Sequence, residues 1–153
     1  MANAAQRLAD LGIDLPDAPA PVANYVPVVR SGSHLYLSGQ ISIGPDGLIR
    51  GKLGADLAID QGVAAARACA INLIAQAKAA LGGDLDRIRR IVKLNGFVNC
   101  TPDFQDHPKV MNGASDLFVA VFGEAGRHAR AAVGAPSLPL GAAVEVDAVF
   151  EIR

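Results

Sequence analysis

Apolar and polar residues alternate along several stretches of the chain, which is the pattern of a β-strand with one buried face. The clearest stretches are residues 34–43, 90–98 and 143–152, and a shorter one, rich in small residues, covers 128–133. In the first stretch the apolar set is Leu35, Leu37, Gly39, Ile41 and Ile43. Proline and glycine in residues 44–47 predict a tight turn, so residues 48–51 are expected to be the short partner strand of a hairpin.

Apolar residues at helical spacing cover two longer stretches. Residues 60–81 predict a helix with Asp60 as N-cap and Gly82-Gly83 as its end, and residues 110–122 predict a second helix that ends at Gly123. A short helix is expected at residues 4–12. After it comes an arm held extended by four prolines: Pro16, Pro19, Pro21 and Pro27.

The order of these elements, β-β-α-β-α-β-β, predicts the fold class. Strands and helices in this order favour an α+β fold, with one mixed β-sheet and two long helices packed on one face. We expect residues 1–153 to form a single domain, in which residues 1–27 contribute the short helix and the extended arm.

The composition limits the class of protein. The chain has 153 residues and a formal net charge of −1 at pH 7, and no apolar run approaches the ~20 residues of a membrane span. The first residues lack the pattern of a secretory signal, so we expect a cytoplasmic protein that needs no membrane. Cys69 and Cys100 lack metal-type spacing and are expected to be free thiols in a reducing compartment. Basic residues are scattered and short of neighbouring aromatic residues, so nucleic acid is not an expected partner.

Strand alternation also predicts a polar face on the sheet. If the apolar sets all face the helices, the opposite face carries Ser38, Lys93, Asn95, Arg130 and Glu145. One interpretation is a solvated face, on which Arg130 and Glu145 form an exposed cross-strand ion pair worth less than ~1 kcal/mol. Another is an oligomer interface, because two helices cover only one side of the sheet. Clefts between subunits often hold ligands, so the second interpretation is compatible with a functional site.

Four motifs in order resemble one known family. They are YLSGQI (residues 36–41), MNGAS (111–115), HAR (128–130) and LPLGAAVEV (138–146). Together they resemble the RidA/YjgF family, also labelled endoribonuclease L-PSP-like, from about Tyr25 to the C-terminus. With Leu15-Pro16 and residues 24–27 included, the chain looks most similar to a longer-armed subgroup in which little function is established.

The resemblance implies a chorismate mutase-like fold and a homotrimer with sheets facing inward and three clefts between subunits. The best-understood members of the family hydrolyse reactive enamines and imines, such as 2-aminoacrylate and 2-iminopropionate, to a 2-oxo acid and ammonia, with neither metal nor organic cofactor, and the resemblance implies the same activity here. By motif position, Arg130 would bind the substrate carboxylate and Glu145 would orient the attacking water. The same likeness places four more residues in the cleft: Ser38 as a further catalytic residue, and Tyr25, Gly39 and Asn112 as substrate-binding residues. We expect Arg130 and Glu145 to emerge side by side on the face away from the helices, covered by a neighbouring copy.

Two positions depart from the family pattern. Ala132 stands where the family often has a cysteine, which bears on the identity of the ligand, and His128 replaces a frequent proline. His34 and His107 lack companion ligands, so no metal site is predicted. Two other functions stay open. One is a non-catalytic protein that holds a small carboxylate metabolite in the same clefts. The other is an endoribonuclease, the least favoured because the chain lacks a basic groove and an obvious histidine pair.

Overall fold

The structure, a computed structural model, describes residues 2–18 and 23–153. Its helices are α1 (Ala4–Asp10), α2 (Ile59–Ala80) and α3 (His107–Phe122). Its strands are β1 (Val28–Ser31), β2 (His34–Ile41), β3 (Ile43–Gly44), β4 (Gly47–Leu48), β5 (Ile88–Asn99), β6 (Ala129–Ala135) and β7 (Val144–Ile152). Short 3₁₀ helices occur at Leu85–Arg87, Gly123–Gly126 and Pro139–Gly141.

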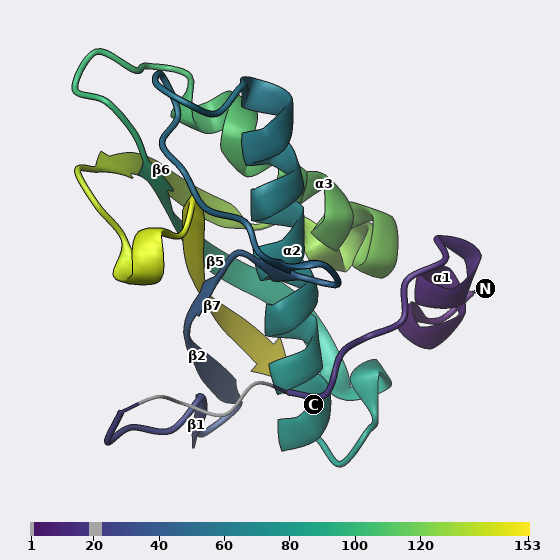
Figure 1. The fold of residues 1–153 in the computed structure, drawn as a ribbon. Coiled ribbons are helices and arrows are strands. Elements are labelled where there is room, and N and C mark those ends of the chain that lie inside the picture. Colours follow the sequence, from purple (N-terminus) through teal and green to yellow (C-terminus); the bar gives the residue numbers. More distant parts are fainter. Residues whose placement is uncertain (1, 19–22) are drawn as a thin grey trace.

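Five of the strands form one mixed sheet in the order β1-β2-β7-β5-β6. Neighbouring strands are antiparallel except β5 and β6, which run parallel. Helix α2 contacts β2 and β7, while α3 contacts β5 and β6, so the two long helices cover the same face of the sheet (Figure 1). The predicted α+β fold, with one mixed sheet and two long helices on one face, is therefore confirmed.

Small residues allow the helices to pack closely on the sheet and on each other. The fully buried residues of α2 are mainly small or branched: Ala65, Ala66, Cys69, Ala70, Leu73, Ile74 and Ala77. Strand β7 presents its alternate side chains to them, and the buried and half-buried positions alternate along its whole length. At Gly113 in α3 an added Cβ would lie 2.1 Å from the Val63 carbonyl oxygen of α2. Only glycine permits this approach between the two helices.

Two strand predictions need correction. Residues 28–31, to which no element was assigned from the sequence, form β1 and pair with β2 at the edge of the sheet. Residues 48–51 do not join that sheet. Instead, β3 and β4 form a separate two-stranded hairpin that packs against α2. The turn predicted at residues 44–47 is confirmed as the turn of this hairpin, with Gly47 at a φ of 106°.

A β-bulge in β2 reverses the predicted alternation after Leu37. The register between β2 and β7 shifts between Leu37 and Gln40. Leu35 and Leu37 are buried as predicted, but Gln40 is buried as well, and Ile41 pairs with Glu145 on the other face. The extra residue of a bulge turns every later side chain to the opposite face. The prediction that Ile41 faces the helices is therefore wrong, whereas Ile43 lies in the β3–β4 hairpin that packs against α2.

The helix ends differ slightly from prediction. Helix α2 has Ala58 at its N-cap position, where the Ala58 N–H donates a hydrogen bond of 2.8 Å to the Gln61 side chain. Asp60 therefore lies in the first turn and is not the N-cap. Helix α3 begins three residues before the predicted start, with Pro108 in its first turn, where a missing N–H costs little. The prolines at 19 and 21 lie outside the described residues.

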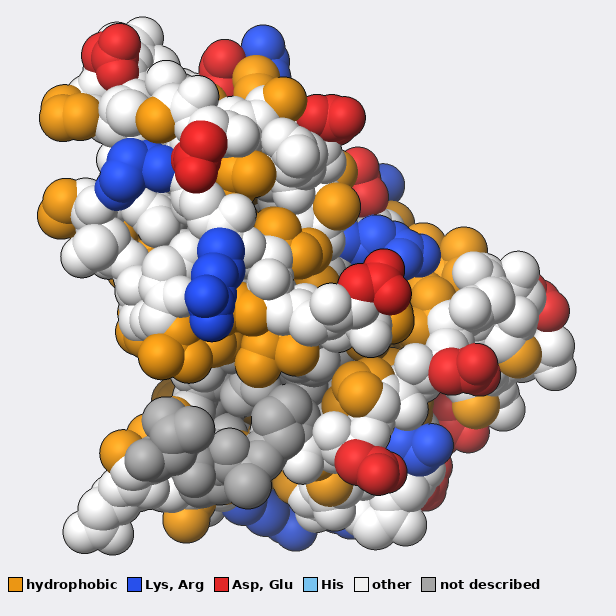
Figure 2. Space-filling model, viewed as in Figure 1, with side chains coloured by type: hydrophobic (Ala, Val, Ile, Leu, Met, Phe, Trp, Pro, Cys, Tyr) orange, Lys and Arg blue, Asp and Glu red, His pale blue; other side chains and the backbone are white. Residues whose placement is uncertain are grey.

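The surface seen over α2 carries charges of both signs among apolar side chains, and neither sign gathers into one large patch (Figure 2). None of the helices in the described part of the chain combines the length and the apolar character needed to cross a lipid bilayer.

Substitution of Gly113 by alanine should destabilise the fold. The new methyl group would meet the backbone of Val63, which cannot rotate away, so the helices must separate at a cost of about 1–3 kcal/mol or more. Chemical denaturation measures this loss of unfolding free energy. Gly44→Ala is the matched control, because its Cβ would have no neighbour nearer than 4.0 Å, and its effect should stay within about 0.5 kcal/mol. Equal stability of the two variants would contradict the close packing described here.

Candidate functional site

Arg130 lies on the edge strand β6 and points toward the helices. In the parallel pairing of β5 and β6, Arg130 is opposite Leu94, whose side chain is fully buried beneath the helices. Paired residues in a sheet share a face. The Arg130 Nη1 donates hydrogen bonds to Asn112 Oδ1 at 2.9 Å and to Ser115 Oγ at 3.2 Å, and both acceptors belong to α3.

Glu145 lies on the other face of the same sheet. Its neighbours along β7, Val144 and Val146, are fully buried on the helix side, so the intervening Glu145 points away from the helices. Lys93 and Asn95 share that outer face as predicted, and the Asn95 Nδ2 donates a hydrogen bond of 2.8 Å to Asp147 Oδ1. The prediction that Arg130 and Glu145 emerge side by side within one chain is therefore wrong. The register between β5 and β6 sends Arg130 to the helix side.

The guanidinium of Arg130 is held by a directional chain of hydrogen bonds. His128 Nδ1 lies 2.7 Å from the Gly126 carbonyl oxygen, and His128 Nε2 lies 2.9 Å from Ser115 Oγ. A carbonyl oxygen only accepts, so Nδ1 carries the proton and the neutral ring accepts at Nε2 from the Ser115 hydroxyl. The Ser115 oxygen in turn accepts from Arg130. We call Arg130, Asn112, Ser115 and His128 the arginine cluster.

Burial favours the neutral form of His128. Partial burial of the ring lowers the pKa of His128, the hydrogen bond to the Gly126 carbonyl opposes this shift, and the nearby charge of Arg130 lowers the pKa further. At pH 7 the ring is therefore neutral, as the hydrogen-bond chain requires. Protonation would turn Nε2 into a donor and force the Ser115 hydroxyl to reorient.

Much of the hydrogen-bonding capacity of Arg130 is unused. Both of its bonds come from Nη1 and end on neutral oxygens, and within residues 2–18 and 23–153 no carboxylate forms an ion pair with it. The donors on Nη2 and Nε are left for an external ligand. This side of a guanidinium matches the two oxygens of a carboxylate in a bidentate pair.

Glu145 is a half-buried carboxylate beside the bulge of β2. An added Cβ on Gly39 would lie 2.8 Å from Glu145 Oε2, so glycine at this position gives the carboxylate its room. Burial, and to a lesser degree the charge of Asp147, raises the pKa of Glu145. No hydrogen-bond donor from the described residues reaches its oxygens. We call Glu145, Gly39 and Ser38 the glutamate face.

Ser38 connects this face to the N-terminal arm that carries Tyr25. The Ser38 hydroxyl donates a hydrogen bond of 2.8 Å to the Val26 carbonyl, and the Ser38 N–H donates one of 2.9 Å to the Pro27 carbonyl. The hydroxyl proton is thus engaged, and Ser38 is left as an acceptor toward a ligand. Tyr25 follows from the same arm with its side chain 47% exposed.

The structure thus divides the predicted site into two parts. It brings Arg130 together with Asn112, and Glu145 together with Gly39, but it places the pairs on opposite faces, with β5 between β6 and β7. Ser115 was not predicted to belong to the site. Its spacing of three residues from Asn112 on a predicted helix was the available signal, because residues three apart share a helix face.

The chain matches a family model described as "YjgF/chorismate mutase-like, putative endoribonuclease" over residues 5–152. It is 55% identical over 153 residues to Protein TCP17 of Trypanosoma cruzi, covering 97% of this chain and 94% of that protein. It is also 27% identical over 143 residues to a 2-iminobutanoate/2-iminopropanoate deaminase of Dermatophagoides farinae, covering 92% of this chain and 95% of that protein.

Solved structures share the fold. The crystal structure of Atu1372 from Agrobacterium tumefaciens, a protein of unknown function, matches with 50% identity and a TM-score of 0.89, covering 96% of this chain and 92% of that chain. The structure of Escherichia coli TdcF with bound serine matches with 25% identity and a TM-score of 0.61, covering 89% of this chain and 93% of that chain. Relatives of this fold thus include a protein named for imine deamination and one that holds a small amino acid.

Removal of the Arg130 charge should raise the pKa of His128, because that charge is one of the causes that lower it. NMR titration of the His128 ring in the wild type should show protonation only below pH ~6.5, the ordinary histidine value. In Arg130→Gln the midpoint of the His128 titration should move to higher pH. Lys109→Gln is the control, because it removes a positive charge from α3 outside the arginine cluster and should leave the midpoint unchanged. An unchanged midpoint in Arg130→Gln would contradict the coupling between the two side chains.

Proposed function

This chain belongs to the YjgF/chorismate mutase-like family, and on that premise we propose that it hydrolyses small reactive imines and enamines of 2-imino acids. The expected substrates are compounds such as 2-aminoacrylate and 2-iminopropionate, and the products are a 2-oxo acid and ammonia. The reaction would take place in clefts between the subunits of a homotrimer. No cofactor takes part in the proposed reaction.

The observation that carries the proposal is the division of complementary groups between two faces. Arg130 has free donors at the open edge of the sheet, and Glu145 is a half-buried base near the middle of the opposite face. One chain cannot direct both groups at one small molecule. A second copy that places its glutamate face against the arginine cluster of the first would complete the site, as the family resemblance implies.

In such a cleft Arg130 would bind and orient the substrate. Its Nη2 and Nε groups can form two parallel, charge-assisted hydrogen bonds to the carboxylate of a 2-imino acid. Asn112 and Ser115 hold Nη1 in place from α3, so the free side of the guanidinium faces the cleft in a fixed plane. Lysine has neither the plane nor the paired donors. Orientation of the substrate would supply much of the rate acceleration, because the imine carbon is intrinsically electrophilic.

Glu145 of the neighbouring copy would then act on water. Its raised pKa makes its ionised form a better base than an exposed carboxylate, and general-base catalysis is worth roughly 10²- to 10⁴-fold. The water attacks the imine carbon and gives its proton to Glu145. That proton then passes to the nitrogen and gives a carbinolamine. The carbinolamine hydroxyl gives its own proton to the nitrogen through Glu145, the C–N bond breaks, and ammonia leaves as the C=O of the 2-oxo acid forms. Gly39 leaves space for the carboxylate, Ser38 accepts a hydrogen bond from the water or the imine N–H, and Tyr25 closes the cleft from the arm.

Ala132 is smaller than the cysteine that the family often has at this position, and we expect this difference to affect the choice of substrate. Ala132 is half-buried and faces α3 two residues after Arg130. A methyl group in place of the thiol leaves more room and one polar atom fewer beside the bound carboxylate. A bulkier or more apolar side chain on the 2-imino acid would fit this space.

A second possible function is the binding of a small carboxylate without catalysis, because the arginine cluster could bind such a ligand without Glu145. The free donors of Arg130 suffice to bind a carboxylate, so the protein could hold a 2-oxo acid or an amino acid without turning it over. Ribonuclease activity has less support. The described surface shows charges of both signs over the helix face (Figure 2), and His128 is neutral and engaged at both ring nitrogens.

Two variants test the reaction and its division between subunits. Arg130→Ala and Glu145→Gln should each lose most of the ammonia release from freshly generated 2-iminopropionate, at least about 100-fold. When the two variants are co-expressed in equal amounts, random assembly leaves about a quarter of the clefts with both groups intact, and a similar share of wild-type activity should return. A site within one chain would show no recovery on mixing. Thermal stabilisation by pyruvate without any turnover would instead establish the binding function.

The rate should fall as pH falls through the raised pKa of Glu145, because only the ionised carboxylate accepts a proton from water. Asp147→Asn removes a neighbouring charge that contributes to this raised pKa. The acid limb of the pH–rate profile should therefore move to lower pH in Asp147→Asn. The limb should stay in place in Asp103→Asn, an exposed carboxylate in the loop before α3. If the Asp147→Asn profile does not move, Glu145 is not the base.

A further inference from the structure

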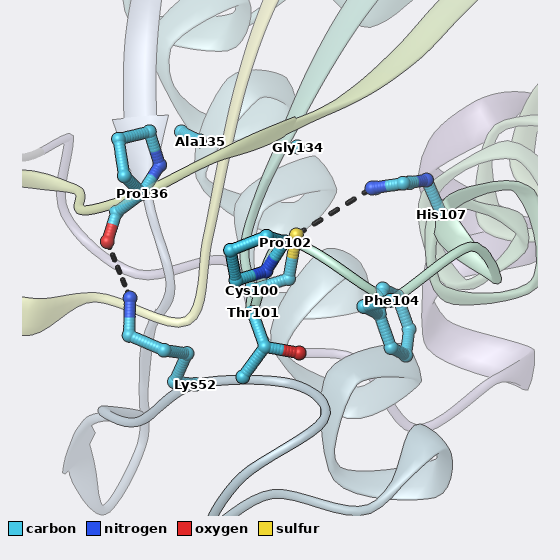
Figure 3. Close-up of a pocket in the computed structure, with 9 residues that line it drawn as sticks. All are labelled: Lys52, Cys100, Thr101, Pro102, Phe104, His107, Gly134, Ala135 and Pro136. Atoms are coloured by element: carbon cyan, nitrogen blue, oxygen red, sulfur yellow. Dashed lines mark hydrogen bonds between the residues drawn. The ribbon is translucent and has the colours of Figure 1, made fainter.

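A cavity of about 440 Å³ lies where the end of β6 meets the start of α3 and the loop before it (Figure 3). Its walls include Pro102, Phe104, Ala135 and Pro136, and its polar groups are the thiol of Cys100, the imidazole of His107, the hydroxyl of Thr101 and the ammonium of Lys52. None of these residues belongs to the proposed hydrolytic site. The cavity therefore needs an explanation of its own.

The thiol and the imidazole form a pair. Cys100 Sγ lies 3.5 Å from His107 Nε2, and the His107 ring packs edge-on against Phe104, with 5.3 Å between the ring centroids. The backbone N–H of Cys100 is held by the Ala135 carbonyl of β6 at 3.1 Å. The base is thus fixed within reach of the thiol proton, which is the arrangement that activates a cysteine as a nucleophile.

Access to the pair depends on Gly134. An added Cβ there would lie 2.7 Å from Cys100 Sγ and 2.7 Å from His107 Nε2. The backbone at Gly134 does not have the positive φ that favours glycine, so conformation does not require glycine at this position. Its missing side chain keeps the thiol and the imidazole open to the cavity.

The cavity also carries a positive charge. Lys52 Nζ donates to the Asn99 side-chain oxygen at 2.7 Å and to the Pro136 carbonyl. Both acceptors are neutral, and among the described residues no carboxylate forms an ion pair with Lys52. The neighbouring carboxylates each have a donor other than the Lys52 ammonium. Asp56 accepts from the Lys52 backbone N–H at 2.6 Å, Asp103 accepts from the Thr101 hydroxyl, and Asp106 pairs with Lys109. The site therefore favours an anionic partner.

Cys69 provides the contrast within the same chain. Its side chain is fully buried under α2, and its Sγ lies 3.4 Å from the Val144 carbonyl oxygen. Burial raises the pKa of the Cys69 thiol well above its ordinary value. Cys69 has neither a base nor a cavity, so it is expected to be inert.

We propose that the Cys100 pocket is a thiol-exchange site that forms a mixed disulfide with small organic disulfides bearing carboxylates. The Cys100 proton passes to His107 Nε2, and the thiolate attacks one sulfur of the disulfide. A bond forms between this sulfur and Cys100 Sγ, while the original S–S bond breaks. The released thiolate takes the proton from His107. Cys100 is oxidised and one half of the disulfide is reduced to a free thiol, so no further oxidant is needed.

Glutathione disulfide and cystamine test the proposal, because they share the reactive bond and carry opposite net charges. Native protein incubated with glutathione disulfide should gain one glutathione adduct, which intact-protein and peptide mass spectrometry place on Cys100. Cys100→Ser should abolish the adduct and Cys69→Ser should leave it. Gly134→Ala should block reaction with both reagents, provided that circular dichroism shows an unchanged fold.

Lys52 and His107 variants distinguish the proposed site from simple thiol exposure. Lys52→Gln should slow the reaction with glutathione disulfide about fivefold or more and should not slow cystamine, whereas Lys52→Arg should restore the wild-type preference. His107→Gln should slow both reagents. The proposal is overturned if native Cys100 takes no adduct, if Cys69 reacts first, or if Lys52→Gln changes both rates alike. None of these readouts depends on imine hydrolysis.

Discussion

The pairing register of the central strands decides where every functional group of this protein points. Side chains alternate across a strand, so the face on which a residue emerges follows from the buried residue beside it. Strand β7 buries Val144 and Val146 and so turns Glu145 outward. Strand β6 pairs Arg130 with the buried Leu94 and so turns it toward α3. A slip of one residue would bury Glu145 against the helices, and the fold could not tolerate that charge without a partner.

Much of this arrangement could be predicted from the sequence, but not the face of β6. Strong periodicity located α2, α3, β5 and β7, because long elements with one buried face leave a clear apolar pattern. Strand β6 consists almost entirely of small residues, and small residues carry little information about which side is buried. The bulge in β2 could not be predicted either. Gly39 fits either face of the sheet, and the polar side chain of Gln40 predicts an exposed position although it is buried. Arg130 and Glu145 were identified by likeness to a family, and their relation in space depended on these two local features.

The separation of Arg130 from Glu145 has an energetic consequence for an assembly. Each group is half-buried and lacks a charged partner among the described residues, and such groups are stabilised by an opposite charge. If a second copy brought them together directly, they would form an ion pair, and a substrate carboxylate would have to compete with Glu145 for Arg130. The attachment of Nη1 to Asn112 and Ser115 limits that competition, because it holds the guanidinium against its own helix.

Helix α3 and strand β6 together contribute residues to both of the proposed sites. Arg130, Ala132 and Gly134 alternate on the helix side of β6, so Ala132 lies between Arg130 and the position that faces the Cys100 pocket. The methyl group of Ala132 offers no hydrogen bond to either site. A polar side chain there could bridge to Arg130 on one side or to Cys100 on the other and so couple their protonation. Alanine at this position therefore provides no hydrogen-bond path between Arg130 and the Cys100 thiol, and the two proposed sites remain separate in this respect.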